Sequence, residues 1–316
     1  MFLGDPFWLD AAALALALIL DITLGEPPAV VHPVVWIGKV VAWLEHRAPK
    51  VGRIAQFSYG LGMALAIPAA FAVAGYFLAA ATRELNPIAY ILITGFLLKS
   101  CFAVRGLGQA ASAVREKLEA DETELARADL SALVSRDTSH LTPSSAASAA
   151  VESVAENTTD SFVAPWLAFA LFGLPGALAY RAVNTLDTMI GYHGKYEYLG
   201  KASARLDDVL NFVPARLSAI IIVAASPLRA HSASRALAVM SKDGSTTESP
   251  NAGLTMAAMA GALGVELEKA GHYRLGSGLR QPTAADIVES VRVMQWAAVV
   301  VCCLTFVLLM VRHAVW

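Results

Sequence analysis

The sequence predicts an all-α, polytopic membrane protein with about four full spans, short broken or re-entrant helices, and amphipathic helices on the cytoplasmic side. The first observation is composition: 56% of the 316 residues are hydrophobic and 16% are charged, whereas soluble domains average about 25% charged residues. The second is a mean hydropathy of +0.55. The third is that the apolar residues gather in uninterrupted segments, as in membrane helices.

Four segments approach the apolar length of a bilayer crossing, which takes about 20 residues, or fewer where the bilayer thins. They are residues 9–24, 57–81, 87–104 and 295–311. The second and third are joined by the short sequence TRELNP, so we expect an antiparallel hairpin. Lys99 lies near the end of the third segment, from which its long side chain can reach the membrane surface.

The stretches between these spans also have helical patterns. Residues 34–53 carry Trp36 and Trp43 among basic residues, which is typical of a helix at the membrane interface. The basic residues from Lys39 to Arg53 place this stretch in the cytoplasm by the positive-inside rule. Residues 105–135, 144–160 and 283–294 are expected to be further helices. We expect one integral membrane domain over residues 1–316, with the polar helical regions 105–160 and 229–294 facing the cytoplasm.

Three apolar segments are too short to cross a membrane as regular helices. Residues 162–172 and 177–189 are divided by the sequence GLPG, and residues 217–228 are shortened at their start by Pro214 and Arg216. The first two form either one kinked span or a hairpin that enters and leaves on the same side. We favour re-entry of the short segments, because all polar clusters then face the cytoplasm and can build one site.

Composition and motifs exclude several classes of function. A formal net charge of -2 and a pI near 6.4 give no basic field, so nucleic acid is not an expected partner. The cysteines, Cys101, Cys302 and Cys303, lie in apolar segments and suggest neither a disulfide framework nor a zinc site. The chain lacks a P-loop, a GxGxxG motif, an HExxH motif and a nucleophile elbow. Any bound nucleotide must be held in another way.

An acidic stripe is the first candidate site. Glu152, Glu156 and Asp160 recur at a spacing of four, which places them on one face of a helix, where like charges repel one another. Such a face needs cations, a metal or hydrogen-bond donors, and its hard oxygen ligands suit magnesium. A solvated helix face is the alternative. We favour a site because the stripe runs directly into an apolar segment, with Asn157 beside it and Arg136 and Asp137 upstream.

Further polar residues lie in or beside apolar helices. Asn184 and Asp187 are one helical turn apart inside an apolar segment, where polar groups are costly and indicate function unless they serve helix packing. Arg205 and Asp208 either pair with each other or leave a guanidinium for phosphate. The remaining candidates are Lys195 and Arg216 downstream, and Asp21, Glu26 and His32 at the end of the first span.

At these residues the sequence resembles the adenosylcobinamide-phosphate synthase family, the membrane protein of cobalamin biosynthesis. The matching strings, which run in order from about residue 21 to 265, are DITLGEP, HPVVWIGK, RDTSHL, AVESVAENTTD, GALAYRAVNTLDTMIGY, ASARLDDVLNFVPARL, SPNAG and AMAGALGV. Ser135 and Ser161 stand where glycine is expected, and neither departure removes a candidate ligand.

The resemblance implies an ATP-dependent amide ligase of the cell (inner) membrane, with its active site facing the cytoplasm. It would join the carboxylate of adenosylcobyric acid to aminopropanol or its phosphate, giving adenosylcobinamide or its phosphate, with ATP as substrate and Mg²⁺. The amphipathic region 249–264 and the interface helix would form the platform for the wide corrinoid. Self-association and contact with other cobalamin-assembly enzymes stay open.

The residues are assigned to roles by the same logic. Catalysis is assigned to Glu152, Glu156, Asp187 and Lys195; substrate or phosphate binding to Arg136, Asp137, Asn157, Asn184, Arg205, Arg216 and His32; and metal binding to Glu156, Asp160, Asp187 and Asp208. The alternative is a membrane transporter or permease for a corrinoid or a cation, because broken helices and buried carboxylates also occur there.

Overall fold

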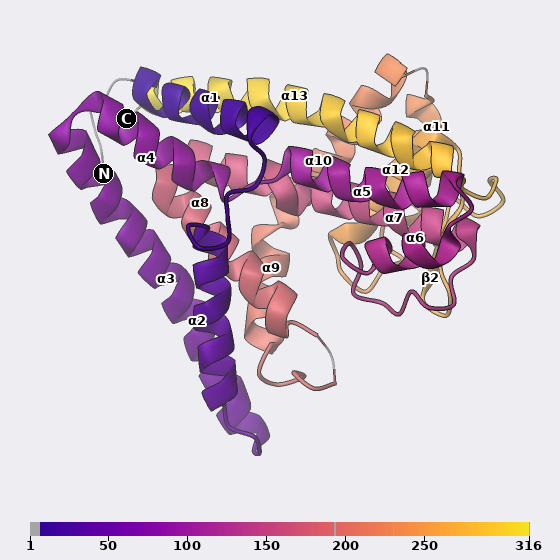
Figure 1. Cartoon of the computed structure of the whole chain (residues 1–316), viewed down its shortest axis with the longest axis horizontal. Helices are drawn as coiled ribbons and strands as arrows, with labels where there is room; N and C mark the ends of the chain where they lie inside the picture. Colours follow the sequence, from indigo (N-terminus) through magenta and orange to yellow (C-terminus); the bar gives the residue numbers. More distant parts are fainter. Residues whose placement is uncertain (1–6, 193, 230, 316) are drawn as a thin grey trace. The chain divides into compact units, whose positions relative to one another are not determined.

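The computed structural model describes residues 7–192, 194–229 and 231–315, and nearly all of its regular structure is helical (Figure 1). This confirms the predicted all-α class. The helices are α1 (Phe7–Thr23), α2 (Pro33–Arg47), α3 (Arg53–Leu85), α4 (Pro87–Lys99), α5 (Val104–Glu119), α6 (Thr123–Leu130), α7 (Pro143–Thr158), α8 (Ala164–Ile190), α9 (Lys201–Leu210), α10 (Phe212–Ala225), α11 (Ala233–Asp243), α12 (Ala252–Leu263) and α13 (Ala284–Val315). A π-helical turn, η1 (Thr159–Val163), joins α7 to α8, and a 3₁₀ turn, η2 (Ser226–Arg229), follows α10.

Five helical stretches of the described chain are long and apolar enough to cross a membrane, so the protein is a multi-pass membrane protein. They are Arg53–Leu85, Pro87–Glu119, Pro143–Ile190, Phe212–Arg229 and Ala284–Val315. The expected first span, α1, has 17 residues and is not among them. The stretch after residue 211 is longer than predicted, because Pro214 lies in the first turn of α10, where proline is tolerated, instead of shortening the helix.

The expected break in the GLPG sequence is present in α8. Gly173 has φ 67° and ψ -158°, a non-helical conformation that favours glycine, and Pro175 follows within the next turn. The break leaves carbonyl groups near the end of the first half of α8 without helical partners. Arg312 of α13 donates hydrogen bonds to two of them, the carbonyl oxygens of Phe169 and Ala170, at 3.2 and 3.0 Å.

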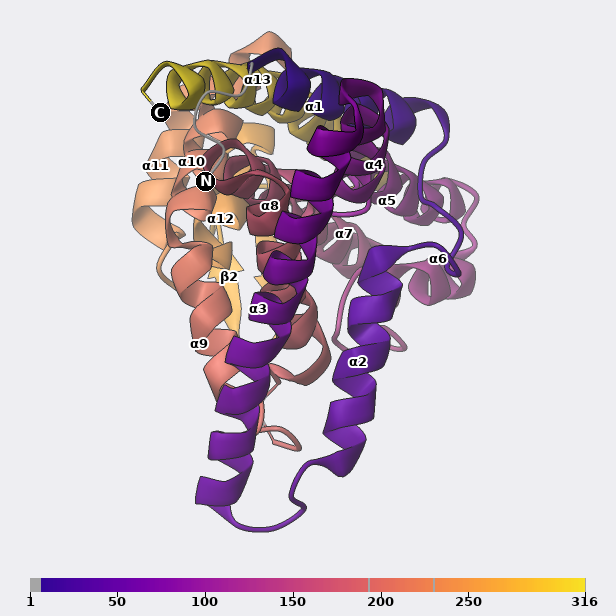
Figure 2. The ribbon, with the colours of Figure 1, turned by 90° about the vertical axis from the view of Figure 1, so that its left-hand side faces the viewer.

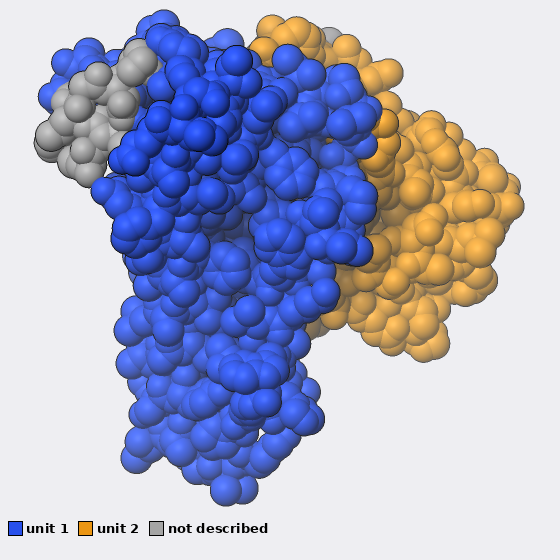
Figure 3. All heavy atoms as spheres, turned by 60° about the vertical axis from the view of Figure 1, so that its left-hand side comes forward, with its two compact units in different colours: residues 1–103, 164–210, 303–316 blue, residues 104–163, 211–302 orange. Residues whose placement is uncertain are grey.

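The contacts divide the chain into two compact units, coloured separately in Figure 3. Unit 1 comprises residues up to 103, residues 164–210 and residues from 303 onward, and unit 2 comprises residues 104–163 and 211–302. Each unit is therefore built from segments that are far apart in the sequence. The expectation of a single domain over the whole chain stays a prediction.

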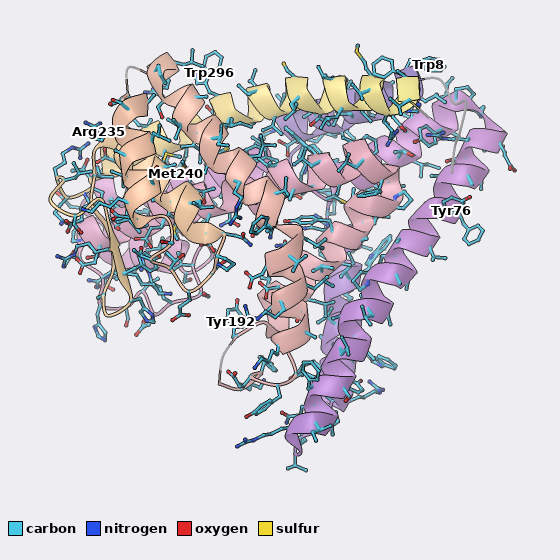
Figure 4. All side chains as sticks on the ribbon, turned by 180° about the vertical axis from the view of Figure 1, so that it is seen from behind. Trp8, Tyr76, Tyr192, Arg235, Met240 and Trp296 are labelled. Carbon is cyan, nitrogen blue, oxygen red and sulfur yellow. The ribbon has the colours of Figure 1, made fainter. Side chains whose placement is uncertain are left out.

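In unit 1, α8 is the central helix. It packs against α2, α3, α4 and α9, and α1 packs along α4. Figures 1 and 2 show α2 and α3 running side by side. Ile37 and Val41 of α2 and Ala182 and Leu186 of α8 belong to one buried hydrophobic cluster. The outer faces are apolar as well: Tyr76 projects from α3, as labelled in Figure 4, and is exposed.

In unit 2, α12 is the central helix and contacts α7, α10 and α11. It is rich in alanine and glycine, and small side chains let neighbouring helices approach closely. The residues from Thr255 to Leu263 are all buried. The expectation of an amphipathic corrinoid platform at residues 249–264 is therefore wrong for most of this segment, because its helix is enclosed by its neighbours and presents no broad face.

A small antiparallel hairpin, which the sequence did not predict, follows α12. Its strands are β1 (Leu267–Lys269) and β2 (Tyr273–Leu275). The carboxylate of Asp243 accepts a hydrogen bond from the amide of Gly276 at 2.7 Å, and that of Glu266 accepts one from Gly278 at 2.8 Å. These bonds anchor the hairpin and its glycine-rich turn to the body of unit 2, and they place Tyr273 beside α7.

Candidate functional site

A polar stripe follows the second half of α8 in unit 1. Arg181, Asn184 and Asp187 occur at intervals of three residues, so they lie on neighbouring turns of one helix. The amide oxygen of Asn184, which is buried, accepts a hydrogen bond from Nη1 of Arg181 at 2.9 Å. Asn184 thus orients a cation within an otherwise apolar helix.

Acidic side chains gather at the C-terminal end of this stripe, around Asp187. The charges of Asp207 and Asp208, both on α9, act on the carboxylate of Asp187. A β-carbon at Gly191 would collide with the Asp187 carboxylate, so glycine there is what lets the chain pass so close to it. Arg205 approaches Asp208 at 3.6 Å, but its side chain is 75% exposed. Of the two alternatives for Arg205, the pairing with Asp208 is present, and it is weakened by solvent.

These acidic residues are the candidates for a magnesium site in unit 1. Among the residues that the structure describes, no group of three or more His, Cys, Asp or Glu side chains is placed to hold a metal. Magnesium usually takes one or two protein carboxylates together with substrate phosphates and water. The close carboxylates of Asp187, Asp207 and Asp208 supply hard oxygen donors of the right kind, so the donor chemistry fits magnesium brought in with a phosphate-bearing substrate.

Lys195 lies on the loop between α8 and α9 and is 74% exposed. It donates a hydrogen bond to the hydroxyl of Tyr196 at 2.6 Å, and Glu45 of α2 is 3.6 Å from it. The hydrogen bond to Tyr196 raises the pKa of Lys195 above its ordinary value, so the side chain is a cation at neutral pH. In this position it can hold an anion but does not have the lowered pKa of a lysine base.

An ion cluster around the buried ammonium group of Lys99 joins the end of α1 to the end of α4 in unit 1. Nζ of Lys99 lies 3.2 Å from Asp21 and 2.9 Å from Glu26, and the Lys99 side chain is only 1% exposed. The expectation that Lys99 reaches the membrane surface is therefore wrong, because two carboxylates hold its ammonium group inside. Burial alone would raise the pKa of Glu26, but hydrogen bonds from His32 and Lys99 lower it below its ordinary value.

His32 belongs to the same cluster and uses both ring nitrogens. Nδ1 accepts a hydrogen bond from the amide of Val34 at 3.2 Å and thereby caps α2, and Nε2 lies 3.0 Å from Glu26. Since Nδ1 accepts, the neutral ring carries its proton on Nε2 and donates it to Glu26. The structure places His32 as a helix cap, and its predicted substrate-binding role stays a prediction.

In unit 2, Glu152 of α7 is the centre of a second cluster. Its carboxylate accepts hydrogen bonds from Ser148 at 2.8 Å and from the hydroxyl of Tyr273 at 3.0 Å, and Arg136 lies 3.2 Å away. Glu152 is 5% exposed. Burial, followed by the charge of Glu152, raises the pKa of Tyr273, so its hydroxyl stays protonated and donates. With these partners, Glu152 is better suited to position Arg136 than to bind a metal.

The other two residues of the acidic stripe predicted from the sequence, Glu156 and Asp160, lie in different surroundings from Glu152. Glu156 is exposed, and Asp160 is partly buried in the π-helical turn η1, a type of turn that is frequent at functional sites. Asn157 donates to the carbonyl oxygen of Ser153 at 3.0 Å. The predicted common face therefore contains one buried carboxylate and two that are more accessible.

Two further predicted phosphate-binding residues lie in unit 2. Asp137 is exposed and accepts a hydrogen bond from the amide of Ser139 at 2.9 Å, which lowers the pKa of Asp137. Arg216 of α10 donates to the carbonyl oxygen of Phe212 at 2.8 Å and stacks over that ring, and it reaches Asn251 at 3.3 Å. Arg216 makes no ion pair among the described residues, so its charge is available to an anion.

The predicted site residues fall into both units. Unit 1 contains His32, Asn184, Asp187, Lys195, Arg205 and Asp208, and unit 2 contains Arg136, Asp137, Glu152, Glu156, Asn157, Asp160 and Arg216. A single site built from both sets stays a prediction.

Sequence reasoning missed Lys99, Arg181 and Tyr273 as members of these clusters. Arg181 had a usable signal, because a charged residue inside an apolar helix is costly. Tyr273 had none, since its position depends on the hairpin.

The fold and these clusters define a multi-pass α-helical membrane protein that holds ionisable side chains inside its apolar helices. In such proteins, residues of this kind usually handle substrates or ions. Residues 14–303 match the family described as CobD/Cbib protein, and the chain belongs to that family. The resemblance found in the sequence motifs is therefore confirmed.

Curated relatives agree over most of the chain. A protein of Dehalococcoides mccartyi (strain CBDB1) named cobalamin biosynthesis protein CobD is 50% identical over 265 residues, which are 84% of this chain and 86% of the relative. Proteins named probable cobalamin biosynthesis protein CobD are 41% identical over 284 residues in Methanothermobacter thermautotrophicus, covering 89% and 92%, and 40% identical over 304 residues in Pyrococcus abyssi, covering 95% and 96%. No solved structure matches the chain. The chain is thus a cobalamin biosynthesis protein of the CobD family.

Proposed function

We propose that this protein is an ATP-dependent amide ligase, an adenosylcobinamide-phosphate synthase. It joins the free carboxylate of adenosylcobyric acid to the amine of aminopropanol or of its phosphate. Membership of the CobD family supports the pathway. The observation that carries the reaction class is the α8 stripe, in which an oriented arginine and close carboxylates occur within one apolar helix and its neighbour.

Amide formation from a carboxylate requires activation, because oxide is a poor leaving group. In the proposed sequence, a carboxylate oxygen of the corrinoid attacks the γ-phosphorus of ATP and ADP leaves, giving an acyl phosphate. The amine nitrogen then attacks the acyl carbon, inorganic phosphate leaves and the nitrogen loses one proton. Both steps move negative charge between phosphate oxygens, which cations stabilise.

The residues divide between binding and proton transfer. Asp187 and Asp208 would hold magnesium together with the substrate's phosphate oxygens, and the magnesium would neutralise phosphate charge and orient the nucleotide when bound. Lys195 would contact a phosphate oxygen.

In unit 2, Arg136 would bind the corrinoid carboxylate or a phosphate, held in place by Glu152. Glu156 is exposed and would accept the proton from the amine.

The test uses the purified chain in detergent. ATP, magnesium, adenosylcobyric acid and either aminopropanol or its phosphate are supplied, and corrinoid amide and ADP are quantified. Formation of both in equal amounts supports the ligase, and the preferred amine identifies the natural substrate. A membrane transporter needs two compartments, so product formation without vesicles excludes transport as the only activity. A pure, folded chain that forms neither product contradicts the proposal.

We also propose that the active site faces the cytoplasm at the inner membrane. Single cysteines introduced by Lys195→Cys and Ser249→Cys, in a chain whose native cysteines are replaced, test this with an impermeant thiol reagent. Labelling of both only from the cytoplasmic side is the expected result. Labelling from opposite sides contradicts one shared site. The expected lipid bilayer contact, the absence of nucleic acid as a partner, and self-association or contact with other assembly enzymes remain proposals.

A further inference from the structure

Arg181 is a charged residue whose hydrogen-bonding capacity is only partly used. It lies within the apolar stretch Pro143–Ile190, and Nη1 donates to Asn184 at 2.9 Å. Nε of Arg181 is buried and has no hydrogen-bond partner among the described residues. No carboxylate of the described chain forms an ion pair with it. The side chain is therefore oriented by Asn184 and keeps donors without a protein acceptor.

An unpaired guanidinium inside an apolar helix is costly, because removing its water is repaid only by a counter-charge or by further hydrogen bonds. Two other arginines in the apolar helices of unit 1 have such a counter-charge. Arg83 and Arg312 both pair with Asp10. Arg181 differs from them, and the missing acceptor is most simply an anion supplied by a ligand.

The groups around Arg181 do not supply that anion. Cys101, at the end of α4, lies close enough for the charges of Arg181 and Lys99 to act on its thiol. The carboxylates nearest to Lys99, Asp21 and Glu26, already hold its ammonium group. In the opposite direction along α8, Asp187 faces Asp207 and Asp208. A positive end and an acidic end thus lie on successive turns of one helix.

We propose that Arg181 binds a phosphate group of a substrate through its free Nε edge, while Asn184 fixes the plane of the guanidinium. A planar guanidinium donates two parallel hydrogen bonds to phosphate oxygens, which a lysine cannot reproduce. The phosphate belongs either to the nucleotide or to the phosphorylated amine, and both present the same oxygens. A nucleotide phosphate would place its magnesium towards the carboxylates of Asp187 and its neighbours. This inference rests on the proposed function and adds a residue to it.

The experiment measures binding, so it does not depend on turnover. Dissociation constants of the full chain in detergent are determined by equilibrium dialysis for ATP with magnesium and, separately, for aminopropanol phosphate, with unphosphorylated aminopropanol as the reference ligand. The variants are Arg181→Gln and Arg181→Lys. In Arg181→Gln, loss of the charge-assisted hydrogen bonds is expected to raise the dissociation constant of the phosphate ligand that Arg181 binds about 10- to 100-fold. Arg181→Lys should weaken it less, and aminopropanol binding should not change.

Arg47→Gln is the matched control. Arg47 is also an arginine of unit 1, but it is exposed on α2, where it stacks over Trp43. Its replacement should leave all three dissociation constants unchanged. Asn184→Ala is a second test should Arg181→Gln fail to fold, because it keeps the charge and removes its orientation. It should weaken the same ligand as Arg181→Lys does.

The outcomes show which ligand supplies the phosphate. They also distinguish a failure of the Arg181 inference from a failure of the proposed ligase function. If the Arg181 variants bind only ATP more weakly, Arg181 contacts a phosphate of the nucleotide. If they bind only aminopropanol phosphate more weakly, Arg181 contacts the phosphate of the amine substrate. Unchanged binding of both in folded Arg181 variants overturns the inference, as does a wild-type chain that binds neither. Wild-type protein that binds a phosphate ligand through Arg181 yet forms no amide contradicts the proposed function alone.

Discussion

Two carboxylates in the apolar helices of unit 1 have opposite surroundings. Asp10 of α1 is 1% exposed and is surrounded by donors from three other helices. Arg83 lies 3.1 Å from it and also donates to Tyr90 at 2.8 Å, Tyr90 and Arg312 form short contacts with it, and His313 is 3.2 Å away. Each charge in this Asp10 cluster has an opposite partner inside the protein.

Asp187 of α8 meets charges of its own sign. The charges of Asp207 and Asp208 act on its carboxylate, and the cation on its own helix, Arg181, donates a hydrogen bond to Asn184. A buried charge therefore does not by itself indicate a functional site. The Asp10 cluster ties helices together through opposite charges, whereas Asp187 lies near two carboxylates of its own sign.

The Asp10 cluster also supports the break in α8. Arg312, held by Asp10, donates to the carbonyl oxygens that the break at Gly173 leaves without partners. In lipid such carbonyls would cost several kcal/mol each. The completed cluster thus holds the second half of α8, on which Arg181, Asn184 and Asp187 lie.

The largest expected effect is on stability, at Asp10. Asp10→Ala leaves two arginines without their counter-charge and should lower the free energy of unfolding by about 3–5 kcal/mol. Thermal unfolding in detergent measures this, with Asp10→Glu as the conservative control that should lose less. Wild-type stability of Asp10→Ala would show that the cluster is not a structural clamp.

The next effect is on chemistry, at Asp187. Asp187→Asn should lower the rate of amide formation about 100-fold, because a charge that neutralises magnesium is lost. Its stability should stay equal or rise, since repulsion from Asp207 and Asp208 is relieved. Turnover and unfolding are measured on the same preparation. Asp187→Asn with wild-type turnover would remove Asp187 from the metal assignment.

Unit 2 allows the same comparison between two glutamates on one helix. Glu156→Gln changes an exposed carboxylate and should reduce amide formation about 10-fold or more with little change in stability. Glu152→Gln removes the counter-charge of Arg136 and should lower stability by about 1.5–3 kcal/mol. If Glu156→Gln forms amide at the wild-type rate, its proposed role in metal binding and proton transfer is wrong.

A smaller effect is expected at Tyr273. Tyr273→Phe removes one hydrogen bond to Glu152 and should lower the free energy of unfolding by about 1 kcal/mol. Chemical denaturation of the wild type and the variant measures the difference, and Tyr76→Phe, a change at an exposed tyrosine of α3, is the control. Equal stability of all three chains would show that the hairpin contact contributes nothing.

The smallest effect is the pH dependence from Glu26. The lowered pKa of Glu26 means that the folded state binds its proton less readily than the unfolded state. Its contribution is therefore complete above the ordinary pKa of 4.5 and is lost as the pH falls through the lowered value. Unfolding temperatures between about pH 3 and pH 6 should show a flatter dependence in Glu26→Gln. The same slope in both chains would contradict the assignment.

Local sequence patterns were enough to predict the helical class, most of the apolar spans, the break at GLPG and the polar residues of α7, α8 and α9. Helix and span signals are local, because each depends on hydrophobicity and on breakers within about 20 residues. The polar residues stood out for the same reason, since they interrupt apolar segments. The motifs shared with the family indicated the biosynthetic pathway.

Which charges have partners depends on the tertiary structure and could not be predicted from local sequence. Lys99 was expected at the membrane surface, but Asp21 and Glu26 hold it inside, and they lie on a segment more than 70 residues earlier in the chain. α12 was expected to be amphipathic, but its small residues let three helices enclose it. Arg181 and Asp10 show the physical reason. The counter-charge of a buried residue comes from helices that are distant in sequence. The sequence of a single segment therefore does not show whether its charged residue stabilises the fold or binds a ligand.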